Sequence, residues 1–185
     1  MAWNKIHKEN SKDKILESAA LLFTQQGFEK VSIDTVMNNA QLTRGAFYSH
    51  FSSKSDLYAQ AIKKGAQQAQ LRKSEQSNHD MALYAQYYLS KQHRDDDIQQ
   101  ACPLAFLVSD ITQQNEQVKN AYTETLQHFI DQVEQSCEKR DQALQSVVLM
   151  IGGLAISRAL NDKVLSDELL LACQKGIVSY SDIKG

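Results

Sequence analysis

The segment from Ser32 to Asp56, SIDTVMNNAQLTRGAFYSHFSSKSD, places two short helical patterns and a turn in very little sequence. Ser32 is a preferred N-cap residue, and apolar residues follow it at the spacing of one helix face. Residues 40–42 make the turn, and Thr43 can cap a second helix over residues 44–51. The segment therefore predicts a helix-turn-helix.

The second of these helices has one apolar and one polar face. Phe47 and Phe51 are separated by four residues, so both can face the core. A helix whose other face is polar fits the major groove of DNA, where arginine in the first turn contacts guanine with two hydrogen bonds. We expect Arg44 to make that contact and the backbone of Gly45 to approach the duplex closely.

Residues around this helix are suited to phosphate oxygens, which fix the register of a protein on DNA without specifying sequence. Tyr48, His50 and Lys54 are of this kind, and Lys54 lies where a further helix begins. The predicted DNA-binding residues are Ser32, Thr43, Arg44, Gly45, Tyr48, Ser49, His50 and Lys54.

Residues 43–57, TRGAFYSHFSSKSDL, resemble the recognition helix and the following helix start of the TetR/AcrR family of bacterial transcription regulators. The resemblance extends back through the apolar helix at residues 15–27. It implies an all-α fold of about nine helices, with an N-terminal three-helix helix-turn-helix domain and a C-terminal helical domain for ligand binding and dimerisation. The chain departs from the family at Gln41, where glycine is usual; a positive φ there would strain glutamine.

Composition agrees with an all-helical fold, because the chain has one proline and seven glycines in 185 residues and an apolar fraction of 42%. The net charge of −2 hides an asymmetry. Residues 1–64 hold 9 Lys and Arg against 6 Asp and Glu, whereas residues 65–185 hold 11 against 16. The positive surplus lies in the helix-turn-helix part, as sequence-specific DNA binding requires.

We expect two domains, a DNA-binding domain over residues 1–56 and a ligand-binding and dimerisation domain over residues 57–185. Residues 1–10 are expected to form a mobile arm, whose lysines either touch DNA or belong to a plain disordered tail. Ser11 is then the cap of the first helix, which Gly27 ends.

In the second domain we expect a first helix from residue 57 through the early seventies, followed by four longer helices and one that starts at Pro103. The longer ones are predicted at residues 81–94, 115–139, 142–160 and 166–183, after a polar turn at residues 73–80. The helix at 142–160 is apolar almost all round, which suggests that a partner subunit covers one side. The resemblance implies the same, a homodimer through the helices 142–160 and 166–183. Aromatic and apolar candidates for an effector pocket are Tyr84, Tyr87, Tyr88, Phe106, Phe129 and Met150.

The three cysteines, at positions 102, 137 and 173, form neither a disulfide framework nor a metal-ligand set. Cys102 falls at the expected N-cap before Pro103, where the helix dipole lowers a thiol pKa; a buried inert cysteine is the alternative. The aspartates at residues 95–97 are interpreted as a solvated loop in preference to a cation site.

These patterns favour a dimeric, cytoplasmic repressor released from a palindromic double-stranded DNA operator by a small-molecule effector. One alternative is a redox or electrophile sensor acting through Cys102, and another is an effector-free DNA-organising factor on the same fold. No enzyme, cofactor or metal is expected, because the chain has no glycine-rich phosphate loop, nucleophile elbow or metal-binding motif. No apolar run of about 18 residues and no signal-peptide core are apparent, so no membrane association is expected.

Overall fold

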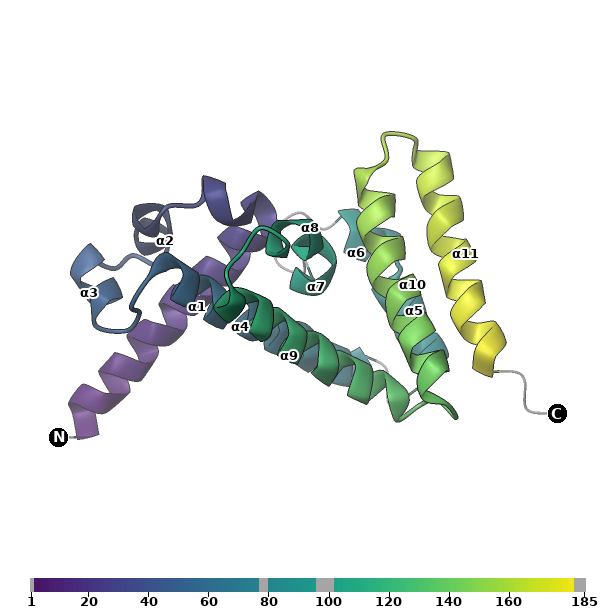
Figure 1. Cartoon of the computed structure of the whole chain (residues 1–185), viewed down its shortest axis with the longest axis horizontal. Coiled ribbons are helices and arrows are strands. Elements are labelled where there is room, and N and C mark those ends of the chain that lie inside the picture. Colours follow the sequence, from purple (N-terminus) through teal and green to yellow (C-terminus); the bar gives the residue numbers. More distant parts are fainter. Residues whose placement is uncertain (1, 77–79, 96–101, 182–185) are drawn as a thin grey trace. The chain divides into compact units, whose positions relative to one another are not determined.

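The computed structural model describes residues 2–76, 80–95 and 102–181. Over these residues the chain is all-helical and contains no strand (Figure 1). The helices are α1 (Ala2–Lys30), α2 (Ile33–Asn39), α3 (Arg44–Tyr48), α4 (Lys54–Gln76), α5 (Met81–Tyr88), α6 (Lys91–Asp95), α7 (Pro103–Phe106), α8 (Val108–Ile111), α9 (Glu116–Glu134), α10 (Arg140–Ala159) and α11 (Lys163–Ser181). They outnumber the nine or so expected because α6, α7 and α8 are short helices of four or five residues.

The chain divides into two compact units. The first contains residues 1–68 and 102–125, and the second contains residues 69–101 and 126–185. Two helices, α4 and α9, contribute residues to both units. The functional division after residue 56 stays a prediction, but the helix-turn-helix shares its unit with α7, α8 and the first part of α9.

Helix α1 has the apolar face that its sequence predicts, and Ile15, Ala19 and Phe23 are buried. Gly27 has φ 78°, a backbone conformation that interrupts the helix and suits glycine. Phe28, which follows, stacks on Phe23 with the ring centroids 6.1 Å apart. The predicted helix end is therefore confirmed.

The expectation of a mobile arm before Ser11 is wrong for residues 2–10, which belong to α1. Ser11 does not cap the helix; its hydroxyl donates to the carbonyl of Lys8 one turn earlier. Extending an existing helix costs little once it is nucleated. Ser11 and Lys12 also have contacts near the end of α3, which hold this part of α1 in place.

Asp110 of α8 joins three elements of the first unit. Its carboxylate accepts the hydroxyl of buried Tyr58 at 2.5 Å and the backbone N–H of Phe28 at 3.3 and 3.4 Å. A Cβ on Gly27 would lie 3.2 Å from Oδ1 of the same carboxylate. Lys63 of α4 also pairs with Glu124 of α9 at 2.5 Å. Helix α8 and the first part of α9 are thus bound to α1 and α4 by specific polar contacts.

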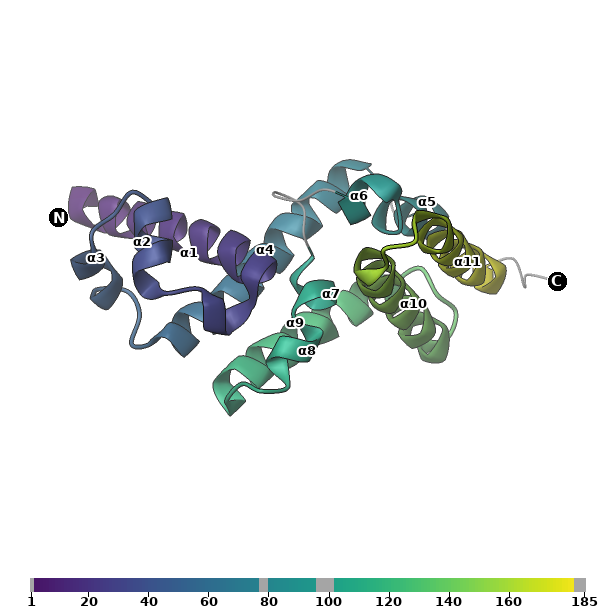
Figure 2. The same cartoon turned by 90° about the horizontal axis from the view of Figure 1, so that it is seen from above.

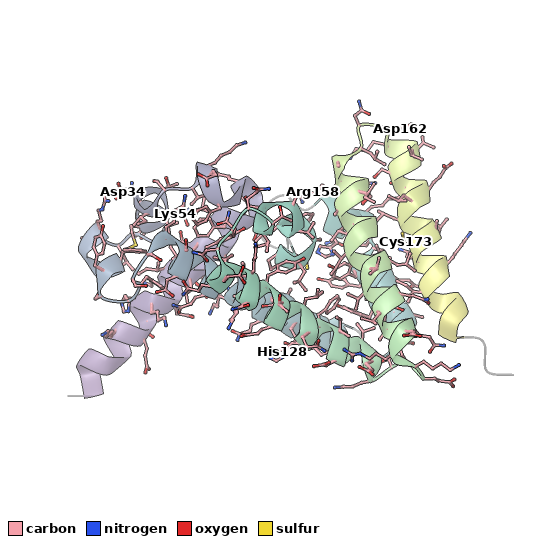
Figure 3. The ribbon with its side chains drawn as sticks, in the orientation of Figure 1. Asp34, Lys54, His128, Arg158, Asp162 and Cys173 are labelled. Atoms are coloured by element: carbon pink, nitrogen blue, oxygen red, sulfur yellow. The ribbon has the colours of Figure 1, made fainter. Side chains whose placement is uncertain are left out.

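In the second unit, α10 and α11 lie side by side and antiparallel (Figures 1 and 2). They approach closely at Gly153, where a Cβ would lie 2.8 Å from the sulfur of Cys173 and 3.0 Å from Cδ2 of Leu89. Cys173 of α11 points towards α10 (Figure 3). Gly153 thus lets Cys173 of α11 and Leu89 pack closely against α10.

A buried arginine ties α6 to the start of α11. The Arg94 side chain is 4% exposed and donates to Asp95, to the Ser166 hydroxyl at 2.8 Å and to Asp167 at 2.6 Å. Ser166 in turn donates to the carbonyl of Ser157 at 2.7 Å. Asp95, expected in a solvated loop, is therefore an ion-pair partner, and residues 96 and 97 lie outside the described residues.

Several of the helix boundaries predicted after residue 73 are wrong. The helix predicted at 81–94 is two helices, because the Ser90 hydroxyl accepts the N–H of His93 and starts α6. The turn predicted at 73–80 is helical up to Gln76, and residues 77–79 are outside the described part. The helix predicted at 115–139 ends at Glu134, whereas Pro103 begins α7 as expected.

Helix α11 starts three residues earlier than predicted, because the Asp162 carboxylate accepts the backbone N–H groups of Val164 and Leu165. Helix α10 is, by length and composition alone, apolar enough to cross a membrane, a feature that inspection of the sequence had not identified. Of its most apolar window, 39% is buried inside the chain, and a single helix of this kind is weak evidence for a membrane span.

Candidate DNA-binding site

The turn between α2 and α3 is a helix-stop motif built around Gln41. The N–H of Gln41 donates to the carbonyl of Asn38 at 3.1 Å, and the N–H of Leu42 donates to that of Met37 at 3.0 Å. This is the Schellman arrangement, in which the residue after the C-cap takes the left-handed conformation. Gln41 has φ 57°, so the strain predicted for a glutamine at this position is present.

The start of α2 is fixed as the sequence predicts. The Ser32 hydroxyl accepts the backbone N–H of Thr35 at 3.0 Å and is exposed. Thr43 stands at the N-cap position of α3, but its hydroxyl makes no capping hydrogen bond. The Thr43 hydroxyl is therefore not occupied as a helix cap.

Helix α3 is shorter than expected and ends at Tyr48. Phe47 and Phe51 are buried as predicted, and their ring centroids are 5.7 Å apart. The residues expected on the opposite face are all exposed: Thr43, Arg44, Gly45, Tyr48 and Ser49. The structure thus brings five of the eight predicted DNA-binding residues onto one solvent-facing surface.

Arg44 lies across the face of the two short helices. Its guanidinium donates to the Asp34 carboxylate of α2 at 2.9 Å, and both side chains are more than half exposed. A hydrogen bond with Tyr48, and then the charge of Asp34, raise the pKa of Arg44. The sequence did not single out Asp34, which Figure 3 labels on α2. This pairing restricts the arginine in the free protein and leaves it accessible.

His50 is half-buried against α1, with its Nε2 atom 2.8 Å from the Ser11 hydroxyl. Burial, and then the charges of Lys8 and Lys12, lower its pKa below the ordinary value of 6.5. The imidazole is therefore mainly neutral near pH 7 in the free protein. Sequence reasoning selected His50 and placed Lys8 among the arm lysines that either touch DNA or belong to a tail, but it missed Lys12.

Lys54 begins α4, where its ammonium lies 4.1 Å from the centroid of the Phe28 ring. The Ser53 hydroxyl caps this helix by accepting the N–H of Asp56 at 3.0 Å, and the Asp56 carboxylate accepts the N–H of Ser52 at 3.0 Å. Burial raises the pKa of Asp56, but hydrogen bonds from Ser52 and Gln60 outweigh it and the net shift is downward. The start of α4 is thus rigidly formed with its lysine on an aromatic support.

A sequence profile described as "Bacterial regulatory proteins, tetR family" matches residues 15–61, which hold α2, α3, the turn between them and the helices on either side. The helix-turn-helix part of the chain is thus similar to the TetR family. The matched residues contain every predicted DNA-binding residue, and the profile ends inside α4.

Two curated TetR-family relatives are similar over the N-terminal region. The TetC protein of transposon Tn10 from Escherichia coli is 41% identical over 64 residues, which are 32% of this chain and 32% of that protein. The negative transcriptional regulator IcaR of the biofilm operon icaADBC, from Staphylococcus aureus strain Newman, is 33% identical over 52 residues, 28% of each chain. The chain therefore matches about a third or less of the length of these relatives.

Solved TetR-family structures extend the likeness to nearly the whole chain. A TetR-family transcriptional regulator from Cytophaga hutchinsonii aligns with TM-score 0.78 and 16% identity over 96% of this chain and 98% of its own. Reduced NemR from E. coli aligns with TM-score 0.77 and 16% identity over 92% of this chain and 97% of its own. At this identity the likeness establishes the fold alone, and it is the fold that the sequence predicts.

The predicted effector residues do not form one cluster. Tyr84, Tyr88 and Phe129 are neighbours, with the Phe129 ring centroid 6.2 and 5.8 Å from those of the two tyrosines. Tyr87 stacks on His93, a buried histidine that the sequence did not single out. Met150 is fully buried in α10, and Phe106 belongs to the other unit.

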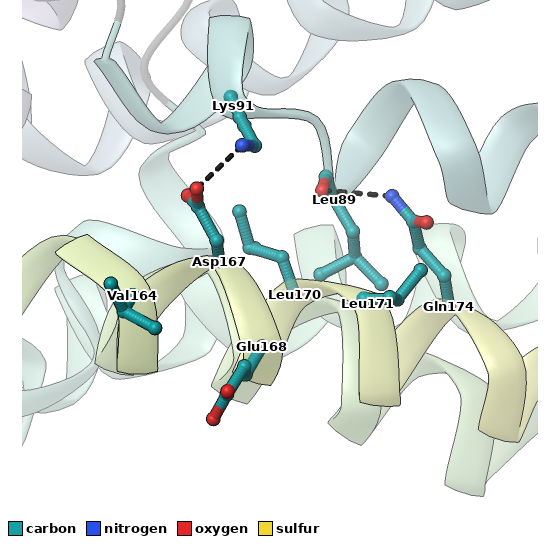
Figure 4. Close-up of a pocket in the computed structure, with 8 residues that line it drawn as sticks. All are labelled: Leu89, Lys91, Val164, Asp167, Glu168, Leu170, Leu171 and Gln174. Atoms are coloured by element: carbon teal, nitrogen blue, oxygen red, sulfur yellow. Dashed lines mark hydrogen bonds and ion pairs between the residues drawn. The ribbon is translucent and has the colours of Figure 1, made fainter.

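A cavity of about 380 Å³ lies along α11, away from the predicted set (Figure 4). Its lining residues are Leu89, Lys91, Val164, Asp167, Glu168, Leu170, Leu171 and Gln174. None of these residues was predicted. The pocket is formed where Lys91 pairs with Asp167 beside one face of α11, and the sequence indicates only that this helix is amphipathic.

Cys102 is buried at the N-cap of α7, as the inert alternative requires, and makes no capping hydrogen bond there. Burial raises the pKa of Cys137 and of Cys173. Within residues 2–76, 80–95 and 102–181, no three histidine, cysteine or acidic side chains are grouped as a metal site.

Proposed function

We propose that the protein is a cytoplasmic, homodimeric transcriptional repressor that binds a near-palindromic DNA operator and is released by a small-molecule effector. The observation that carries the proposal is the exposed face of α3, with Phe47 and Phe51 holding it from behind. The IcaR relative is a negative transcriptional regulator, which favours repression.

In this proposal the eight DNA-binding residues have different tasks. Arg44 leaves Asp34 to contact a base edge, and Gly45 allows the helix backbone to come close to it. Exposed hydroxyls position the protein on phosphates, as do the cation of Lys54 and the ring of His50. The hydroxyl-bearing residues are Ser32, Thr43, Tyr48 and Ser49.

The dimer would form through α10 and α11. Val148 and Ile156 are 68% and 54% exposed on α10, and Gly152 lies between them on the same helix face with open space around it. Val164 and Leu165 of α11 are also exposed. An exposed apolar stripe of this kind is typical of a protein–protein interface, and a second copy of the chain would remove it from water. A two-fold dimer would place its two α3 helices about 34 Å apart, one turn of DNA.

The effector would bind in the second unit. The aromatic cluster of Tyr84, Tyr88 and Phe129 and the cavity along α11 are its two candidate sites there. Because α4 and α9 contribute to both units, an effector that favours another position of either helix would also bias the unit that holds α3.

A factor without an effector is the second candidate, favoured by one observation. The three rings of the aromatic cluster contact one another, as they do in an ordinary core. The test is whether a small molecule releases the protein from operator DNA. If substitutions at these rings abolish that release, this candidate is excluded.

Selection of bound sequences from a random pool of DNA duplexes tests the proposal, with the mass of each complex recorded. A palindromic motif bound by two or four chains is expected. Arg44→Ala should then lose about 1–3 kcal/mol of discrimination at one base position, because a bidentate contact is removed. Equal losses on the selected and on random duplexes would contradict the role assigned to Arg44, and the absence of any motif would refute the proposed function.

A further inference from the structure

The first part of α1 presents a basic face beside the end of α3. Ile15 and Ala19 form the inner face of α1 and are fully buried. Lys12 and Lys8 stand on the same face nearer to the N-terminus, since residues four apart share a helix face. This face therefore leaves the apolar core and becomes cationic within about one turn.

The cationic face meets the residues that follow the recognition helix. The Ser11 hydroxyl lies 2.8 Å from Nε2 of His50, and the ammonium of Lys12 lies 5.7 Å from the centroid of the Phe51 ring. Lys8 and Lys12 both act electrostatically on His50. Three groups that carry or can accept a positive charge thus converge where α1 passes the end of α3.

Two acidic residues of α1 are engaged away from this cluster. Asp13 and Glu17 pair with Lys64 of α4, at 2.5 and 3.7 Å. Among the side chains that the structure describes, no ion pair within 4 Å involves Lys8 or Lys12. The charge of Lys12 also acts on the Asp56 carboxylate at the start of α4, but the two groups form no ion pair within 4 Å. The ammonium groups of Lys8 and Lys12 therefore stay available to a polyanion.

A DNA strand borders the major groove on each side of an inserted helix, and proteins contact these strands mainly through lysine, arginine and hydroxyl groups. We propose that Lys8, Lys12 and His50, with the Ser11 hydroxyl, form a phosphate-binding site for the DNA strand beside the groove that α3 enters. The site rests on the proposed function, and it replaces the expected mobile arm with a folded helix that holds the backbone.

The dependence of DNA affinity on salt tests the site. The full chain and the double variant Lys8→Gln/Lys12→Gln are titrated with the duplex selected from the random pool and with a random-sequence duplex, from about 50 to 200 mM NaCl. Each lost phosphate contact reduces the slope of log K against log salt by about 0.9. The fourfold range of salt should therefore cost the double variant about 10-fold less affinity than it costs the wild type, on both duplexes.

Lys14→Gln is the matched control, because it removes the same charge from an exposed position on another face of α1. Its slope should equal that of the wild type, and glutamine should preserve the helix in all variants, as circular dichroism can verify. The bases selected from the pool should not change, since phosphate contacts carry no sequence information.

Equal slopes for the double variant and for Lys14→Gln would overturn the phosphate site and leave the proposed function standing. If the wild type selects no sequence, the proposed function fails, and the slopes on the random-sequence duplex still decide the site. If the wild type binds neither duplex, both proposals are refuted.

Discussion

Substitution of Asp110 by alanine should destabilise the first unit more than its half-exposed position suggests. The carboxylate accepts the hydroxyl of Tyr58, a side chain with 0% exposure, and the backbone N–H of Phe28. Burial, and then the hydrogen bond to Asp110, raise the pKa of Tyr58, so the phenol stays protonated and always donates. Removing the acceptor leaves a buried donor without its partner.

The magnitude follows from these contacts. An unsatisfied buried hydroxyl costs about 1–3 kcal/mol, and the loss of the bond to the Phe28 N–H adds about 1 kcal/mol. Asp110→Ala should therefore lower the free energy of unfolding by about 2–4 kcal/mol, or the melting temperature by roughly 4–16 °C for a chain of this size. Tyr58→Phe removes the donor and the need for the acceptor together, and should cost about 1 kcal/mol.

Urea denaturation at one fixed protein concentration measures both changes, since the stability of a dimer depends on concentration. The decisive comparison is a double-mutant cycle. In the Tyr58→Phe background, Asp110→Ala should cost about 1–2 kcal/mol less than in the wild type, because no donor is left unsatisfied. The same cost in both backgrounds would refute the reasoning.

Three other substitutions test particular contacts. Gln41→Gly should raise the free energy of unfolding by up to about 1 kcal/mol in urea denaturation. Glycine relieves about 1–2 kcal/mol of strain at the positive φ of this position, but the greater freedom of the unfolded chain offsets part of that gain. A lower free energy of unfolding would show that Gln41 is not strained. Gly153→Ala should cost about 1–3 kcal/mol by overpacking against Cys173 and Leu89; a melting temperature equal to or above that of the wild type would count against the packing. Burial, and then the charges of Lys8 and Lys12, lower the pKa of His50, whereas a bound phosphate would raise it, so DNA binding takes up a proton. DNA affinity should therefore rise as the pH is lowered from about 8 to about 6, and it should rise less for His50→Gln. An identical pH dependence for the two proteins would remove His50 from the site. The stability of the free protein should change in the other direction. The pKa of His50 is lower in the folded than in the unfolded chain, so the free energy of unfolding should decrease as the pH falls through about 6.5.

The helix-turn-helix could be predicted from the sequence because its signals are local. Ser32 caps α2 through a residue three positions away, and Phe47 and Phe51 are one helical turn apart. Gly27 and Gln41 both take the positive φ that a helix stop requires, and the sequence marks one as usual and the other as strained. Each of these features depends on fewer than about six neighbouring residues.

The boundaries that sequence reasoning missed depend on partners far along the chain. Residues 2–10 look like a tail because nothing near them in sequence is apolar enough to hold them, yet Ser11 finds His50, 39 residues away. Asp110 gives no local signal of its role, since its partners Tyr58 and Phe28 are 52 and 82 residues away. A periodic pattern shows which face of a helix is buried but not which element covers it.

The same difference separates the two candidate sites. The DNA-binding face lies on one short helix and its flanking turns, so residue type and spacing were enough to select the exposed set. An effector pocket is made by several elements, and the aromatic residues that mark a pocket also mark an ordinary core. Tyr84, Tyr88 and Phe129 were selected on that ambiguous signal, and they pack on one another. The cavity along α11 depends instead on where Lys91 and Asp167 meet, and only the folded chain brings those two residues together. An effector screen should therefore include substitutions at both places. Substitutions in a core should lower the free energy of unfolding, as we expect at the aromatic cluster, whereas substitutions in a pocket should weaken effector binding, as we expect at the cavity.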